Sequence, residues 1–245
     1  MKLHEALGIT SGDVVAFVGA GGKSGAILAV SNGLRQAGMK VLVAPTTKML
    51  LGEADKIGPL VTSKDPGELR ENAEGALSES PAVVAGSGML SRNRFGGVDP
   101  DWIGDLAPFV DVVLVEADGS RRRPIKGTAD HEPAIPEAAT LVVAVGNVHA
   151  LGTPVDEEHV HRPEVFSDLT GVGPGQSITP GAFATAIARG SLAKVPQTAR
   201  TAALITGVEP GRSMSDASVI TRELWRRGVK NVVLASFSPP RVWVP

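Results

Sequence analysis

A glycine-rich segment that follows an apolar run constrains the fold of this chain more than any other feature. Residues 14–18 read Val-Val-Ala-Phe-Val, and the sequence continues Gly19-Ala20-Gly21-Gly22-Lys23-Ser24. Because glycine adopts backbone conformations that other residues avoid, such a segment can curl round a polyphosphate. Successive N–H groups then face the phosphate oxygens from the start of the next helix. The segment therefore predicts a strand, a phosphate-binding loop and a helix.

The last two residues of this segment have separate predicted roles. The Lys23 ammonium would reach the β- and γ-phosphates, and the Ser24 hydroxyl would coordinate Mg²⁺. The full motif has another glycine where this chain has Phe17, so only its second half, Gly19-x-x-Gly22-Lys23-Ser24, matches. We therefore expect residues 19–24 to bind a nucleoside triphosphate, ATP or GTP, together with Mg²⁺.

Two other interpretations of the segment remain open. A dinucleotide-binding loop, Gly-x-Gly-x-x-Gly, would use Gly19 and Gly21, but Ser24 stands at its third glycine. The next apolar run also ends in Pro45-Thr46-Thr47-Lys48 and lacks the acid that binds a ribose hydroxyl. The other interpretation is an ordinary glycine-rich turn. We prefer the phosphate-binding loop, and we expect Thr46, Thr47 and Lys48 to join the nucleotide site.

Valine-rich runs alternate with helix-length segments along the chain. This alternation is typical of an α/β protein with a mostly parallel sheet between two layers of helices. Expected strands lie at 14–18, 41–44, 82–85, 112–116, 141–145, 202–205 and 232–235. Expected helices lie between the first two strands, at 180–189 and at 216–227, and expected long loops at 92–100, 120–139 and 146–179. The sequence predicts a P-loop NTPase-like three-layer fold, with residues 1–245 as a single nucleotide-binding domain.

Composition limits the kinds of partner. The formal net charge is −2 and the basic residues are scattered, so we expect neither nucleic acid nor a membrane surface as a ligand. The absence of cysteine excludes thiolate metal sites and leaves an oxygen-bound ion such as Mg²⁺ as the expected metal. No apolar run has the length of a signal peptide or a membrane span, and we expect a cytoplasmic protein.

Two carboxylates, Glu116 and Asp118, stand at the end of the apolar run 112–116. An acid at the carboxyl end of a strand beside a phosphate loop can bind Mg²⁺ directly or through water. We expect at most one of the two to face the phosphates, and we favour Glu116.

The segment after these acids combines cations, an imidazole and a carboxylate. Lys126, His131 and Glu132 are the candidates for moving a proton or holding the reacting group. We interpret Arg121 and Arg122 as solvated charges. The candidate contacts to an anionic substrate are Arg94, His161 and Arg162. The His159-Val160-His161 spacing alone is weak support for zinc, because no third ligand is in register.

In combination, these motifs resemble the YqeC family. The resemblance runs in order from about residue 3 to 237, and the motifs that carry it are the phosphate loop, Pro45-Thr46-Thr47-Lys48, Val115-Glu116-Ala117-Asp118-Gly119-Ser120, Arg123-Pro124-Ile125-Lys126, His131-Glu132-Pro133-Ala134-Ile135-Pro136 and His161-Arg162-Pro163-Glu164. The family is described as accessory proteins of selenium-dependent molybdenum hydroxylases, involved in selenium cofactor biosynthesis. The resemblance implies a P-loop nucleotide-binding protein with a molybdenum hydroxylase or its cofactor as partner. It implies no particular reaction.

One departure from the family bears on the base of the nucleotide. Relatives tend to have Asn-Lys-x-Asp, which reads guanine, where this chain has Thr206-Gly207-Val208-Glu209. ATP is therefore preferred over GTP. The expected function is a Mg²⁺-dependent nucleotide-binding protein and NTPase that assists maturation of a selenium-containing molybdenum cofactor or hydroxylase. The alternatives are a small-molecule kinase or ligase that uses ATP, and a nucleotide-gated delivery chaperone without chemistry on the cofactor.

Overall fold

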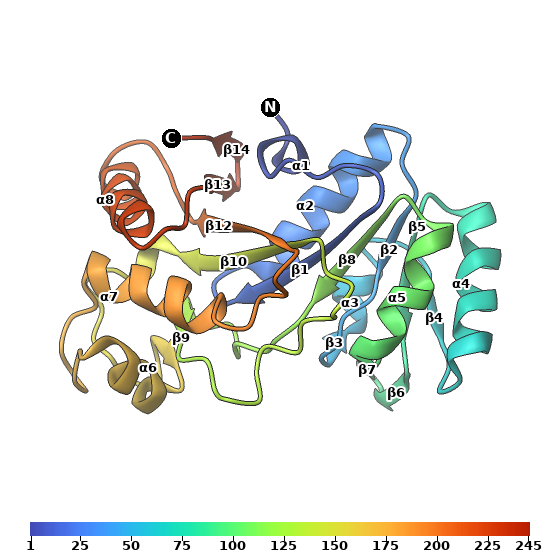
Figure 1. Cartoon of the computed structure of the whole chain (residues 1–245), viewed down its shortest axis with the longest axis horizontal. Helices are drawn as coiled ribbons and strands as arrows, with labels where there is room; N and C mark the ends of the chain where they lie inside the picture. The colour runs from blue at the N-terminus through green and yellow to red at the C-terminus, as the bar shows by residue number, and fades with distance from the viewer.

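The computed structural model describes residues 1–245 and is built round one nine-stranded sheet. The strands lie in the order β14-β13-β12-β10-β1-β8-β2-β5-β4, and every pair is parallel except β13 and β14 at one edge (Figure 1). The bounds are β1 (Asp13–Gly19), β2 (Val41–Val43), β4 (Leu60–Thr62), β5 (Ala82–Gly86), β8 (Val112–Glu116), β10 (Leu141–Asn147), β12 (Arg200–Thr206), β13 (Val232–Phe237) and β14 (Pro240–Trp243). The central strand is β1, and all seven of its residues are buried.

Helices cover both faces of the sheet. Along β1, Val14, Ala16 and Val18 pack in a core with α4 to α8, whereas Val15 and Phe17 pack in a second core with α1 to α3. Because side chains alternate across a strand, a central strand buried on both faces is apolar at every position. The helices are α1 (Leu3–Ala6), α2 (Lys23–Gln36), α3 (Leu51–Ala54), α4 (Pro66–Glu79), α5 (Ile103–Leu106), α6 (Pro163–Thr170), α7 (Pro180–Thr185), which a π-helix at Ala186–Ser191 continues, and α8 (Arg212–Arg226).

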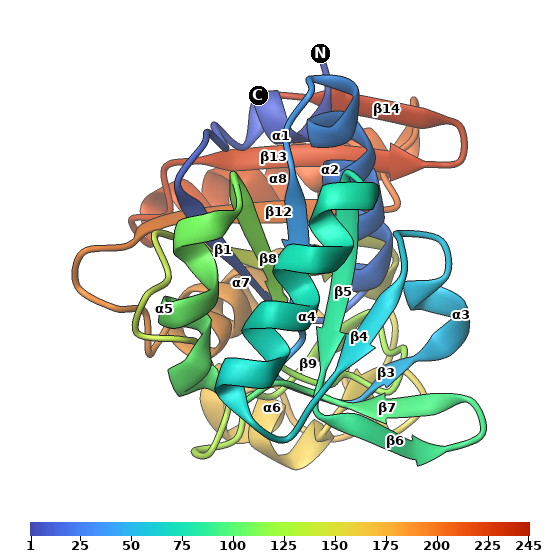
Figure 2. The ribbon, with the colours of Figure 1, turned by 90° about the vertical axis from the view of Figure 1, so that its right-hand side faces the viewer.

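Two small sheets stand at the carboxyl edge of the large one. An antiparallel sheet joins β3 (Met49–Leu50), β7 (Arg94–Gly96) and β6 (Gly88–Ser91), and Figure 2 shows β6 and β7 as a hairpin below β4 and β5. A parallel pair joins β9 (Ile125–Lys126) to β11 (Val160–His161). These additions bring segments that are distant in the sequence to the edge where β1 runs into the glycine-rich loop.

The fold class and all seven expected strands are confirmed. The short or edge strands β3, β4, β6, β7, β9, β11 and β14 were not foreseen, and β7 and β9 interrupt the loops expected at 92–100 and 120–139. The edge strand β4 has only three residues, and β14 begins with Pro240, which only an edge strand tolerates. The expectation of a continuous loop at 146–179 is wrong, because this segment contains β11 and α6. Pro163 is the first residue of α6 and Phe166 is fully buried beneath it, but eight residues are too few to show a helical period.

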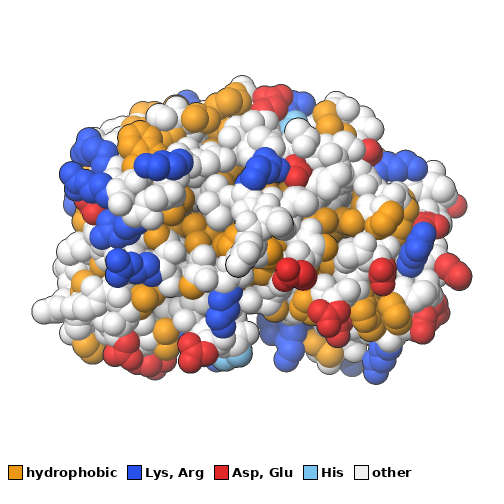
Figure 3. Space-filling model, in the orientation of Figure 1, with side chains coloured by type: hydrophobic (Ala, Val, Ile, Leu, Met, Phe, Trp, Pro, Cys, Tyr) orange, Lys and Arg blue, Asp and Glu red, His pale blue; other side chains and the backbone are white.

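Charges of both signs share the face drawn in Figure 3. Basic side chains are most frequent toward the end that holds α8, and acidic ones are interspersed elsewhere. None of the helices combines the length and the hydropathy needed to cross a membrane.

Candidate functional site

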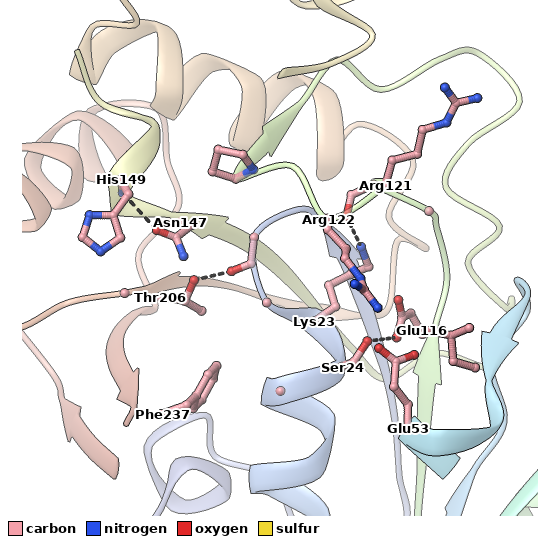
Figure 4. A pocket seen from close by; sticks show the side chains of 18 of the residues that line it. Lys23, Ser24, Glu53, Glu116, Arg121, Arg122, Asn147, His149, Thr206 and Phe237 are labelled. Carbon is pink, nitrogen blue, oxygen red and sulfur yellow. Dashed lines mark hydrogen bonds between the residues drawn. The ribbon is translucent and has the colours of Figure 1, made fainter. Parts of the chain in front are cut away.

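A polar cleft of about 840 Å³ lies at the carboxyl edge of the sheet. Only two of the 23 residues that line it are hydrophobic, so it suits a polar ligand. Its walls are the glycine-rich loop, residues that follow β2, β8, β10, β12 and β13, and part of the β3–β7 sheet (Figure 4). Ligands of open parallel sheets bind at this edge.

The loop requires glycine for two reasons. Gly19, Gly21 and Gly22 have positive φ angles of 89°, 77° and 125°, a region that other residues rarely adopt. A Cβ atom on Gly21 would also lie 2.5 Å from the carbonyl oxygen of Pro124 and 2.6 Å from Cβ of Asn147. The hydroxyl of Thr206 donates to the Gly21 carbonyl, so the end of β12 holds the loop in place. The loop is therefore rigid and tightly enclosed on its inner side.

Free backbone donors face the cleft from this loop. Neither the Gly21 nor the Gly22 amide donates to another backbone group, and α2 begins at Lys23 without a side-chain cap. The first amides of a helix lack intrahelical partners and carry the positive end of its dipole. The loop and the start of α2 together form a ready anion-binding surface.

The loop lysine lies against its own loop. Lys23 Nζ donates to the Gly19 carbonyl at 2.7 Å and lies 3.1 Å from Asp118 Oδ1, with its side chain 2% exposed. Asp118 is fully buried; its Oδ2 accepts from the Gly19 amide at 2.8 Å and from Lys126 Nζ at 3.1 Å. Oδ2 of Asp118 thus accepts two hydrogen bonds, whereas the buried Oδ1 accepts none and has only the ion-pair contact with Lys23.

The ion pairs continue from Lys126 away from the cleft. Lys126 Nζ lies 2.5 Å from Glu132 Oε2, and the Arg162 guanidinium contacts both oxygens of Glu132, at 2.5 and 3.1 Å. Burial alone would raise the pKa of Glu132, but hydrogen bonds from Arg162 and Lys126 outweigh it and lower the pKa to about 2. Burial and the charges of Lys126 and Arg162 lower the pKa of His161 to about 4. This imidazole is therefore neutral at pH 7.

A hydroxyl and two carboxylates meet beside the loop. Ser24 Oγ donates to Glu116 Oε2 at 3.1 Å, and Figure 4 shows the Glu53 carboxylate next to this pair. Burial, to which the Glu53 charge adds, raises the pKa of Glu116 despite the nearby Lys23. Such oxygens suit Mg²⁺, which usually takes one or two carboxylates and fills its other positions with phosphates and water. No three His, Asp or Glu side chains gather into a metal site anywhere in the chain.

The cleft contains only part of the residues proposed from the sequence. Two of them, Lys48 and Arg94, line it without any ion pair or side-chain hydrogen bond. The others that line it, with the contacts given above, are Gly21, Gly22, Lys23, Ser24 and Glu116. Thr46 turns instead to the backbone, where its hydroxyl donates to the Ala134 carbonyl at 3.1 Å. The other proposed residues outside the lining are Gly19, Ala20, Thr47, Asp118, Lys126, His131, Glu132, His161 and Arg162. Of these, His131 is exposed to solvent.

Several residues of the cleft were not predicted from the sequence, namely Glu53, Asn147, His149 and Phe237. Arg121 and Arg122 also line the cleft, although the sequence was interpreted as making them solvated charges. Asn147 and Phe237 end strands β10 and β13, beyond the point where their apolar runs stop. A signal was therefore present, because the residues that end each parallel strand reach this same edge. Glu53 could not be predicted in this way, because the helix α3 that carries it has four residues, too few to show a helical period in the sequence.

Comparisons with known proteins agree on one family. A family model described as YqeC protein matches residues 15–164, from β1 into α6, and so includes the loop, Glu116 and Arg162. The chain is also 35% identical over 167 residues to "Uncharacterized protein YqeC" of Escherichia coli (strain K12). That alignment covers 67% of this chain and 63% of the relative, so the match spans somewhat less than two thirds of the relative's length.

Proposed function

The chain belongs to the YqeC family, and on this premise we propose that it binds a purine nucleoside triphosphate with Mg²⁺ and hydrolyses it. One observation carries the proposal. The free amides of the glycine-rich loop, the Lys23 ammonium and the Ser24–Glu116 pair lie together at the carboxyl edge of a parallel sheet. An anion-binding loop beside oxygen ligands for Mg²⁺ is the arrangement that nucleotide hydrolysis needs.

Lys23 can leave Asp118 and bind a phosphate, because Asp118 has a second cationic partner. When the Lys23 ammonium turns to the β- and γ-phosphates, Asp118 keeps its contact with Lys126 and is not left as an unpaired buried charge. Asp118 thereby steadies the loop through the Gly19 amide, and we assign it no place on the metal.

Mg²⁺ would be held by Ser24 and Glu116, with Glu53 in support, and would neutralise charge on the phosphates. The raised pKa of Glu116 reflects the cost of keeping a buried carboxylate charged beside Glu53. A cation would remove that cost, so the residues present fit the ion. The base would occupy the other end of the cleft, where Asn147, His149 and Phe237 line the wall.

The test is thermal unfolding with ATP, GTP, ADP and GDP, each with and without Mg²⁺. A nucleotide at 100 times its Kd adds about 2.7 kcal/mol to the free energy of unfolding, which raises Tm by about 5 °C or more. We expect Lys23→Ala to abolish this shift while the unliganded protein stays folded, and Lys64→Ala, an exposed lysine outside the cleft, to retain it. If no nucleotide raises Tm, or Lys23→Ala responds like the parent, the proposal is wrong.

Within this function, we propose that hydrolysis assists maturation of a selenium-containing molybdenum hydroxylase or its cofactor. The support is the motif resemblance to the YqeC family. The measurement is nucleotide turnover with and without a purified hydroxylase that lacks its cofactor. Stimulation by that protein and not by its mature form is expected, and equal turnover with both forms would contradict the role.

Lys48 and Arg94 favour a second candidate, phosphoryl transfer to a small anionic molecule. Both cations line the cleft without an acidic partner, and either would attract a carboxylate or phosphate on an acceptor. A kinase would consume ATP only when the acceptor is present and would pass the γ-phosphate to it. A hydrolase releases inorganic phosphate without any acceptor, so measuring phosphate release in the protein's buffer alone separates the two.

A further inference from the structure

A strained turn follows Glu116 at the mouth of the cleft. The amide of Arg123 donates to the Ser120 carbonyl at 2.9 Å, and the two residues between them, Arg121 and Arg122, have φ angles of 47° and 62°. A turn with two left-handed central residues normally uses glycine or asparagine there. Arginine at both positions is unfavourable, typically by about 1 kcal/mol or more per residue. Only one other non-glycine residue in the chain, Arg162, has a positive φ.

The turn is held in place from both sides. Before it, Lys126 Nζ donates to the Gly119 carbonyl at 2.9 Å; after it, the Asn147 amide donates to the Pro124 carbonyl at 2.9 Å. A strained backbone conformation persists only where the contacts around it hold it in place, and such conformations concentrate at ligand-binding sites. The position of the turn is therefore fixed relative to both the phosphate loop and β10.

The two arginines point in different directions. In Figure 4 the Arg122 guanidinium turns down toward Ser24 and Glu116, whereas the Arg121 side chain extends away from them. Arg121 also lines the cleft, but its charge acts on His161, which lies outside the cleft. Arg122 has no ion pair and no hydrogen bond to its side chain, so its fork of donors is free.

We propose that Arg122 is a catalytic residue that contacts the γ-phosphate and stabilises the charge that develops on its oxygens during hydrolysis. This proposal rests on the nucleotide hydrolysis proposed above. In that reaction the oxygen of water bonds to the γ-phosphorus, and the bond to the β–γ bridging oxygen breaks with its electron pair passing to the diphosphate. The proton of the attacking water leaves with the phosphate product or to solvent. Lys23 would neutralise the bridging oxygen, Ser24 and Glu116 would hold the Mg²⁺ that supplies further positive charge when bound, and Arg122 supplies the positive charge at the γ-oxygens that phosphoryl transfer requires.

The experiment compares Arg122→Ala with Arg121→Ala, which leaves the left-handed backbone of the same turn equally strained and removes the same charge. For Arg122→Ala we expect kcat for the hydrolysed nucleotide to fall by about 10³-fold with KM changed less than about threefold. Arg121→Ala should stay within about twofold in both. Arg122→Lys keeps the charge without the planar fork and should recover only part of kcat.

A binding measurement covers the case of slow turnover. The complex of Mg²⁺, nucleoside diphosphate and aluminium fluoride imitates the transferring phosphate, and its stabilisation of the parent should be lost in Arg122→Ala. Stabilisation by Mg²⁺ and diphosphate alone should remain. Equal behaviour of the two alanine variants, or a parent that binds nucleotide without forming the fluoride complex, overturns the role of Arg122. A parent that binds no nucleotide overturns the proposed function itself, which the Lys23→Ala comparison detects separately.

Discussion

Two acids at the end of β8, only two residues apart, occupy opposite electrostatic environments. Asp118 lies between two buried ammonium groups, each 3.1 Å away, whereas Glu116 accepts from one hydroxyl and has Glu53 as a neighbour. Removing the charge of Asp118 leaves two lysines without their shared anion. Removing the charge of Glu116 relieves a buried like-charge contact. Residues two positions apart share a face within a strand, so the difference arises because β8 ends at Glu116 and Asp118 lies beyond the strand.

Substitution of these acids should accordingly change stability in opposite directions. We expect Asp118→Asn to lower the free energy of unfolding by about 3 kcal/mol, because the buried ammonium groups of Lys23 and Lys126 lose the carboxylate that they share. Glu116→Gln should leave this energy unchanged or raise it, and should abolish the Mg²⁺ dependence of nucleotide binding. Urea unfolding and nucleotide titration with and without Mg²⁺ measure the two effects. A loss of stability in Glu116→Gln equal to that in Asp118→Asn would contradict the assignment.

The pH dependence of stability follows from His161 and Glu132. Since the pKa of His161 falls from 6.5 to about 4 on folding, the unfolded chain takes up a proton first, and stability declines as pH falls from 6.5 to 4. The pKa of Glu132 falls from 4.5 to about 2, so its contribution of about 3 kcal/mol is present above pH 4.5 and is lost as pH falls toward 2.

The measurement is the free energy of unfolding in urea between pH 7 and pH 3. We expect His161→Asn to flatten the curve between pH 6.5 and 4, and Glu132→Gln to lower stability at pH 7 while reducing the slope below pH 4.5. A His161→Asn curve parallel to that of the parent would show that this imidazole does not control the first decline.

At the scale of elements, glycines in a loop and in a helix carry opposite consequences. Gly21 in the phosphate loop has a positive φ and no room for a Cβ atom, whereas Gly75 in α4 has nothing within 4 Å of the position that a Cβ would take. We expect Gly75→Ala to raise the free energy of unfolding by about 0.5–1 kcal/mol. Gly21→Ala should lower it and remove nucleotide binding. Thermal unfolding with and without nucleotide distinguishes the two, and tolerance of Gly21→Ala would mean that the loop is not rigid.

Elements with many local signals could be predicted from the sequence, and those that depend on distant contacts could not. The interior strands are continuous apolar runs, so β1 and β8 were located within one residue. The strands β9 and β11 have two residues each and exist because Lys126 pairs with His161 across the fold. Lys126 was predicted as a site residue, but its burial between Asp118 and Glu132 was not. The spacing of charged residues in the sequence does not show which of them meet in the interior.

At the scale of the whole molecule, the sheet order sets where the chain is most stable. The central β1 has strands on both sides and helices on both faces, whereas β14 and β4 are edges. We expect amide hydrogen exchange to be slowest in β1, β8 and β10 and fastest in β14 and the β6–β7 hairpin. Bound Mg²⁺–nucleotide should slow exchange at the start of α2 more than at β14. Equal slowing at both places would show that the ligand acts through global stability alone.

The series of ion pairs that runs from the loop to α6 carries a net positive charge. Lys23, Lys126 and Arg162 contribute three positive charges, and Asp118 and Glu132 contribute only two negative ones. These ion pairs therefore carry one positive charge in excess, and the free amides of the loop beside Lys23 are the place where an anion can bind. Sulfate and phosphate in a buffer compete for this anion-binding position with any physiological polyanion, so affinities measured in such buffers underestimate the true strength of binding. A chloride buffer of low ionic strength is therefore the medium in which to search for the natural ligand.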